Sequence, residues 1–74
     1  MSNQLTYEQL LDMEGQIVRV VDRECDYHSQ ICEVSLSNDD AGDLWLTLSN
    51  GGYEFAYDPA GKCVDGEFEA YLVE

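Results

Sequence analysis

The spacing of hydrophobic residues along the chain changes once, close to Gly15, and this change predicts a short helix followed by strands. The segment that ends at this glycine, residues 5–15, has both ends of a helix marked. Thr6 is a suitable N-cap, and Gln9, three residues later, completes a capping box. Leu10 begins the apolar stripe that such a helix must bury, and Gly15 supplies a left-handed stop at its end.

After residue 15 the hydrophobic positions alternate with a period of two, which is typical of strands. The predicted strands cover residues 16–22, 30–37, 43–49, 53–58 and 67–72. In the last four, one set of alternate positions is mostly apolar and the other mostly polar, so one face of the sheet is expected to pack on a core. The first strand is apolar on both sides around Arg19, and its pattern leaves open which side faces inward.

The segments between the predicted strands have the composition of turns. Residues 37–42 form a polar loop, residues 50–52 read Asn-Gly-Gly, and residues 58–61 read Asp-Pro-Ala-Gly. Short connections between sequential strands predict an antiparallel meander. We therefore expect a single α+β domain over residues 1–74, with a short N-terminal helix followed by a four- or five-stranded antiparallel sheet. An SH3-like small barrel is the closed variant of this arrangement.

The net charge changes this picture from a generic small domain to one with a defined kind of partner. The chain has 16 Asp and Glu against 3 Lys and Arg, for a formal charge of -13. Small domains need a magnitude of only about 2–8 for solubility, and a larger excess of one sign destabilises the compact state. Nucleic acids and anionic membranes would repel this chain, whereas basic proteins would be attracted to it. The alternative interpretation is acidity that serves solubility alone.

The expected location is the cytoplasm, because the first four residues lack the features of a signal peptide and no apolar run has membrane-spanning length. For a protein of phage origin, this would be the host cytoplasm. The three cysteines, Cys25, Cys32 and Cys63, are an odd number and are expected to be reduced thiols.

Catalytic chemistry has little support in the sequence. There is one histidine, no serine in a nucleophile-elbow context and no glycine-rich phosphate loop, and no pair of carboxylates is marked as buried and dissimilar. We therefore predict a protein that is not an enzyme and has no cofactor.

Four residues could form a tetrahedral metal site: Cys25, His28, Cys32 and Cys63. Structural zinc sites usually offer cysteines in close pairs, whereas the last of these four lies far along the chain. Cys32 also falls on the inward side of its predicted strand. The preferred interpretation is therefore that the cysteines pack in the core and that no metal is bound.

The outward side of the predicted sheet gathers the candidate partner-binding residues. Those on the strands are Glu33, Trp45, Glu54, Glu67, Glu69 and Tyr71, and those at the end of the first strand and in its loop are Asp22, Glu24 and Asp26. The solvent side of an antiparallel sheet is ordinarily polar, but ordinary surfaces intersperse both signs of charge. The predicted face has almost no Lys or Arg, and an exposed Trp45 or Tyr71 would supply the anchor that charge alone lacks.

In size, acidity and single-domain form, the chain resembles the phage-encoded inhibitors that mimic nucleic acid, such as anti-CRISPR and anti-restriction proteins. The resemblance is one of composition, without a shared motif. It implies binding to the nucleic-acid groove of a defence complex. The leading hypothesis is an acidic binding protein that occludes a basic, nucleic-acid-binding surface of a partner, and that itself binds neither nucleic acid nor membrane. The alternative is a structural or assembly module of a larger complex, with self-association through Trp45 or a strand edge left open.

Overall fold

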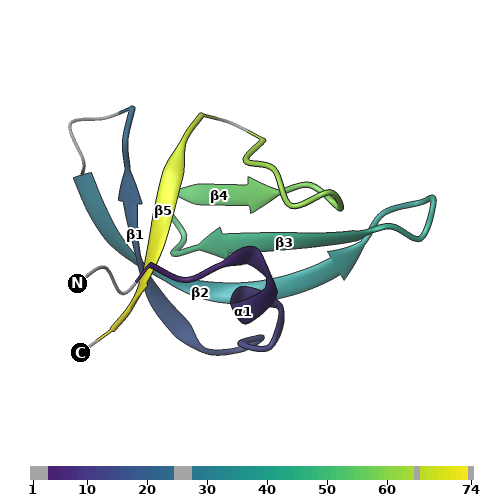
Figure 1. Ribbon diagram of the computed structural model, residues 1–74, viewed down its shortest axis with the longest axis horizontal. Coiled ribbons are helices and arrows are strands. Elements are labelled where there is room, and N and C mark those ends of the chain that lie inside the picture. Colours follow the sequence, from purple (N-terminus) through teal and green to yellow (C-terminus); the bar gives the residue numbers. More distant parts are fainter. Residues whose placement is uncertain (1–3, 25–27, 65, 74) are drawn as a thin grey trace.

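The computed structural model describes residues 4–24, 28–64 and 66–73, which form one short helix and five strands in a single curled sheet (Figure 1). The elements are α1 (Tyr7–Leu11), β1 (Ile17–Asp22), β2 (His28–Asn38), β3 (Leu44–Ser49), β4 (Glu54–Tyr57) and β5 (Phe68–Leu72). Neighbouring strands are antiparallel, in the order β4-β3-β2-β1-β5. The structure confirms the prediction of a helix followed by an antiparallel sheet. The helix is a minor part of the fold, which is mostly sheet.

Helix α1 has the predicted capping box but ends earlier than predicted. The side-chain oxygen of Thr6 accepts a hydrogen bond from the Gln9 backbone N–H, and the Gln9 side chain accepts one from the Thr6 N–H, at 3.1 and 2.8 Å. The helix ends at Leu11, and a turn continues to Gly15, whose φ is +84°. The Gly15 N–H donates to the Val34 carbonyl at 2.8 Å, so the chain has already entered the sheet there. Among the described residues, no helix approaches the length and apolar content that crossing a bilayer requires.

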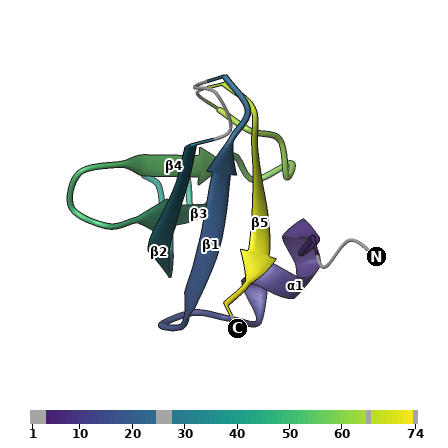
Figure 2. The ribbon, with the colours of Figure 1, turned by 90° about the vertical axis from the view of Figure 1, so that its left-hand side faces the viewer.

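The predicted meander is correct for β1 to β4, whereas β5 pairs with β1, as the closed variant of the prediction implies. A meander would place β5 beside β4, but Val20 of β1 pairs with Ala70 of β5. The connection between Tyr57 and Phe68 takes the chain from β4, one edge strand of the sheet, to β5, the other edge strand. Figure 2 shows β1 and β5 side by side, with β3 and β4 running across them. The two edge strands meet through side chains, since the ring of Phe68 lies 5.1 Å from that of Phe55 and 4.8 Å from that of Tyr57.

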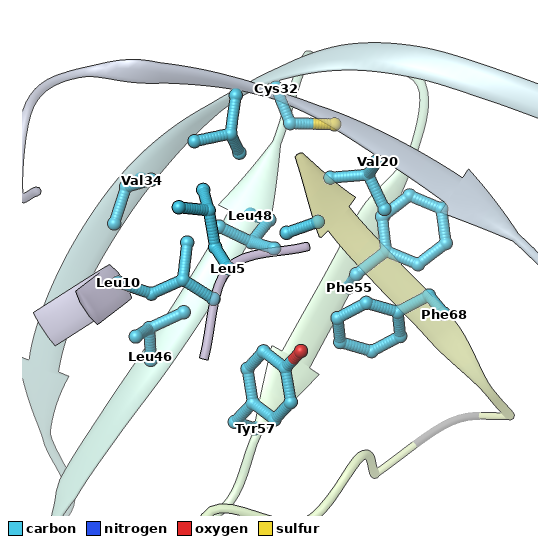
Figure 3. Close-up of a cluster of buried hydrophobic side chains, with 12 residues drawn as sticks. Leu5, Leu10, Val20, Cys32, Val34, Leu46, Leu48, Phe55, Tyr57 and Phe68 are labelled. Carbon is cyan, nitrogen blue, oxygen red and sulfur yellow. The ribbon is translucent and has the colours of Figure 1, made fainter. Parts of the chain in front are cut away.

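The core fills the concave side of the sheet and is closed by α1 and the segment before it (Figure 3). The side chains of Leu10, Leu46 and Leu48 have no solvent exposure. Leu5 packs in the same cluster, and its N–H donates to the Ala70 carbonyl of β5 at 2.7 Å. The N-terminal segment is thereby held along the outer edge of β5.

The structure fixes the orientation of the first strand, which the sequence pattern left open. Val18 and Val20 face inward and are fully buried, whereas Ile17 faces outward with 54% of its surface exposed. Arg19 therefore also lies on the outward side, together with Val21. This orientation decides which charges share the outer face of the sheet.

Three predicted turns are each stabilised by the side chain of the residue that opens them. In each turn, one side-chain oxygen accepts hydrogen bonds from two backbone N–H groups, at 2.9–3.0 Å. The accepting residues are Asp39, Asn50 and Asp58. Two of the chain's many carboxylates thus have a structural role as well as a charge.

Candidate partner-binding surface

The outward side chains fall into rows that cross the sheet, because paired residues on neighbouring antiparallel strands point to the same side. The row that crosses β1 to β4 is Ile17, Glu33, Ser49 and Glu54. The row that crosses β5, β1 and β2 is Tyr71, Arg19 and Ile31. The predicted site residues therefore divide between two parts of the outer face.

The first part belongs to a stretch of sequence that contains no positive residue. Residues 24–61, called the acidic segment below, hold eight Asp and Glu and no Lys or Arg. They include β2, β3 and β4 with their connecting turns. The eight carboxylates are those of Glu24, Asp26, Glu33, Asp39, Asp40, Asp43, Glu54 and Asp58. All three Lys and Arg of the chain lie outside this segment, so the charged side chains of the segment itself have one sign.

Two exposed glutamates mark one end of this surface. Glu33 and Glu54 flank Ser49 in the same row, two strand spacings apart, which corresponds to about 9.6 Å. The adjacent row contains the small side chains of Ser35, Thr47 and Ala56. The surface beside the two carboxylates is therefore shallow, and cationic side chains of a partner can approach it without displacing a bulky residue.

Trp45 lies on the outward side of β3, as predicted, and its indole N–H forms a hydrogen bond within the protein. Its side chain is partly buried, and its indole Nε1–H donates to Asp39 Oδ2 at 3.0 Å. This bond, followed by the backbone N–H of Asp43, holds the pKa of Asp39 below its ordinary value. Trp45 thus holds the β2–β3 turn in place, and its part as a binding anchor stays a prediction.

The second part of the outer face, at β5 and the end of β1, contains both charges. The Tyr71 hydroxyl donates to Glu69 Oε1 at 2.6 Å, and this bond is the main reason that the pKa of Tyr71 is raised. Arg23 Nη1 lies 3.7 Å from a carboxylate oxygen of Glu69 and 3.8 Å from one of Glu67. The Arg19 guanidinium lies over the Tyr71 ring, 4.8 Å from its centroid.

The expectation of an outer face with a single sign of charge is therefore wrong at this end. Two of the three cations, Arg19 and Arg23, lie beside Glu67, Glu69 and Tyr71. The sequence pattern did not assign Arg19 to the outer face, because the orientation of its strand was open. It also left open whether β5 lies beside β4 or beside β1, and the structure pairs β5 with β1.

Of the three acids predicted at the end of β1 and in its loop, the structure describes Asp22 and Glu24. Asp22 is partly buried, and its Oδ1 accepts a hydrogen bond from the Glu24 N–H at 3.0 Å, so its carboxylate stabilises the turn. Glu24 is exposed, and its carboxylate lies close to Gly66, where a Cβ atom would come within 2.7 Å of Glu24 Oε2. Asp26 lies outside the described residues.

The candidate metal ligands are not brought together where the structure describes them. Cys32 is 1% exposed and points into the core, as predicted, and this burial raises the pKa of its thiol. Cys63 pairs with Tyr57 as an isolated bridge, and His28 begins β2 opposite Asp22. Within residues 4–24, 28–64 and 66–73, no group of three or more His, Cys, Asp or Glu is arranged to hold a metal ion. Cys25 lies outside these ranges.

Two exposed isoleucines, Ile17 and Ile31, were not among the predicted surface residues. The sequence pattern did indicate that Ile31 faces outward. Ile31 occupies the outward phase of a strand whose inward residues, Cys32 and Val34, were assigned correctly. Ile17 had no such signal, because both sides of its strand are apolar.

No protein-family model, no curated protein sequence and no solved structure matches the chain.

Proposed function

We propose that this protein is an acidic binding protein that occludes a basic, nucleic-acid-binding surface of a partner protein. The observation that carries the proposal is the acidic segment, whose sequence has eight Asp and Glu and no Lys or Arg and includes the three adjacent strands β2, β3 and β4. A net charge of -13 at this size has a cost in self-repulsion, which a basic partner would relieve.

Electrostatics would give this interaction a fast association and a strong dependence on salt. Complementary charges accelerate the encounter of two proteins, and added salt screens this attraction over about 8–10 Å. Phosphates repeat about every 3.4 Å along the axis of one nucleic-acid strand. Glu33 and Glu54, about 9.6 Å apart across the outer face, can together with the carboxylates of the connecting turns present negative charge to a groove lined with Lys and Arg. Glu33 and Glu54, on the shallow part of the face, are the strand residues placed for this contact.

The test compares two charge reversals of equal size in a pull-down from a bacterial lysate. Glu33→Lys with Glu54→Lys alters the acidic segment, whereas Glu67→Lys with Glu69→Lys alters the part where Arg23 lies within 4 Å of both carboxylates. Both double variants change the net charge from -13 to -9. The expected result is that wild type retains a nucleic-acid-binding protein at moderate salt, that added DNA or RNA displaces it, and that the first variant loses it more completely than the second.

Two results would argue against the proposal. One is a partner whose retention is indifferent to both salt and nucleic acid. The other is equal retention by wild type and by the Glu33 and Glu54 variant. Circular dichroism on both variants checks that a loss of binding does not come from a loss of the fold.

A further inference from the structure

The outer face of the two central strands carries a pair of exposed isoleucines. Ile17 of β1 is 54% exposed and Ile31 of β2 is 47% exposed. Ile17 pairs with Glu33 and Ile31 pairs with Arg19, so the two isoleucines are diagonal neighbours on the same face. Single exposed apolar residues are ordinary, but an adjacent pair in the middle of a sheet is more typical of an interaction surface.

An aromatic ring and a guanidinium extend this apolar surface towards β5. Tyr71 lies in the same row as Ile31, with Arg19 between them, and the Arg19 guanidinium stacks on the Tyr71 ring. The Tyr71 hydroxyl donates a hydrogen bond to Glu69 Oε1 at 2.6 Å. These contacts fix the Tyr71 side chain before any partner arrives, which lowers the entropic cost of burying it. Tyr and Arg are also the residue types enriched at the energetic centres of interfaces.

Carboxylates border this patch, defined by Ile17, Arg19, Ile31 and Tyr71. Glu33 lies beside Ile17 in its row, and Glu69 lies two residues before Tyr71 on the same strand. A second copy of the chain would bring another charge of -13 against this border, and an anionic membrane would be repelled in the same way. A partner with an apolar centre and a rim of Lys or Arg would complement both the patch and its border.

We infer that the patch is the apolar centre of the binding surface, and that it docks an apolar cluster bordered by Lys or Arg on the partner protein. This inference rests on the proposed function and adds to it the chemistry of the partner. Charge supplies the encounter, and burial of the two isoleucines supplies the part of the affinity that salt does not remove.

The test uses two synthetic helical peptides with identical lysines. One has leucine along its other face, and the second has glutamine in place of each leucine. Calorimetric titration at moderate salt should show that the leucine peptide binds wild type at least roughly tenfold more tightly than the glutamine peptide. Ile17→Thr with Ile31→Thr, which keeps β-branched side chains, should abolish this difference and leave binding of the glutamine peptide unchanged. Val64→Thr, an exposed residue beside β4, is the control and should preserve the difference.

Each other outcome overturns a stated part of the inference. Equal binding of the two peptides to wild type, or an undiminished difference in the isoleucine variant, removes the patch from the binding surface while leaving the electrostatic proposal in place. Failure of both peptides to bind contradicts the proposed function and the patch together. Sedimentation that shows a wild-type dimer and a monomeric isoleucine variant would assign the patch to a second copy of the chain instead.

Discussion

At the scale of single residues, Asp39 shows that a carboxylate in this acidic chain can stabilise local structure. Its Oδ1 accepts hydrogen bonds from the N–H groups of Ala41 and Asp43, and its Oδ2 accepts one from the Trp45 indole. These donors favour the ionised form and hold the pKa of Asp39 below its ordinary value of 3.8, with the indole as the largest cause. Because the folded pKa is lower than the unfolded one, this stabilisation is fully present above pH 3.8 and is lost as the pH falls through the lowered value.

Replacement of Asp39 by Asn should therefore destabilise the protein at neutral pH. The amide can still accept from the backbone, but its NH₂ group cannot accept from the Trp45 indole. We expect Asp39→Asn to lower Tm by roughly 4 °C at pH 7 and to red-shift the emission of Trp45, with the difference from wild type shrinking below pH 3.8. Asp40→Asn, an equal change of charge at the neighbouring exposed residue, is the control. The same loss of stability in both variants would show that net charge, and not the hydrogen bonds of Asp39, sets the effect.

At the scale of elements, the capping box makes a separable contribution to α1. A helix of five residues has few internal hydrogen bonds, so its end contacts weigh heavily in its stability. Thr6→Ala should cost about 1 kcal/mol of unfolding free energy, or roughly 4–8 °C in Tm for a domain of this size. Denaturant titration of Thr6→Ala, Gln9→Ala and the double variant measures the coupling between the two side chains. Strictly additive losses would mean that the two reciprocal hydrogen bonds do not act as a unit.

Most elements could be predicted from the sequence because local residues specify them. Thr6, Gln9 and Gly15 marked the helix, and alternation with side-chain-capped turns marked β2 to β4. The partner of β5 was left open between β4, as in an open meander, and β1, as in the closed variant, since pairing of Val20 with Ala70 depends on the curl of the whole sheet. The helix was predicted too long because Gly15 ends a turn that follows α1 instead of the helix itself.

The candidate surface was predictable to the extent that each strand's orientation was. Glu33 and Glu54 were correctly placed on the outer face, because their strands alternate clearly. The contacts of Arg23 with Glu67 and Glu69 were not predicted, since they require both the orientation of β1 and its pairing with β5. Long-range pairing thus limited the prediction of the surface more than local pattern did.

At the scale of the whole molecule, the uneven placement of the cations predicts how charge affects stability. The acidic segment has only repulsion among its eight carboxylates, whereas Glu67 and Glu69 each lie within 4 Å of Arg23. Salt screens repulsion between exposed charges, so the Tm of wild type should rise as NaCl is increased from low to moderate concentration. A Tm that falls with salt would mean that attractive pairs dominate.

The two double charge reversals separate net charge from its position, because both bring the molecule to -9. At low salt, Glu33→Lys with Glu54→Lys should raise Tm above that of wild type and weaken its dependence on salt, since repulsion within the acidic segment is reduced. Glu67→Lys with Glu69→Lys should gain less or lose stability, since it places two lysines beside Arg23 and removes the acceptor of the Tyr71 hydroxyl. Scanning calorimetry over a salt series measures both. Identical curves for the two variants would show that total charge alone governs stability, and the division of the outer face into two parts would then have no energetic meaning.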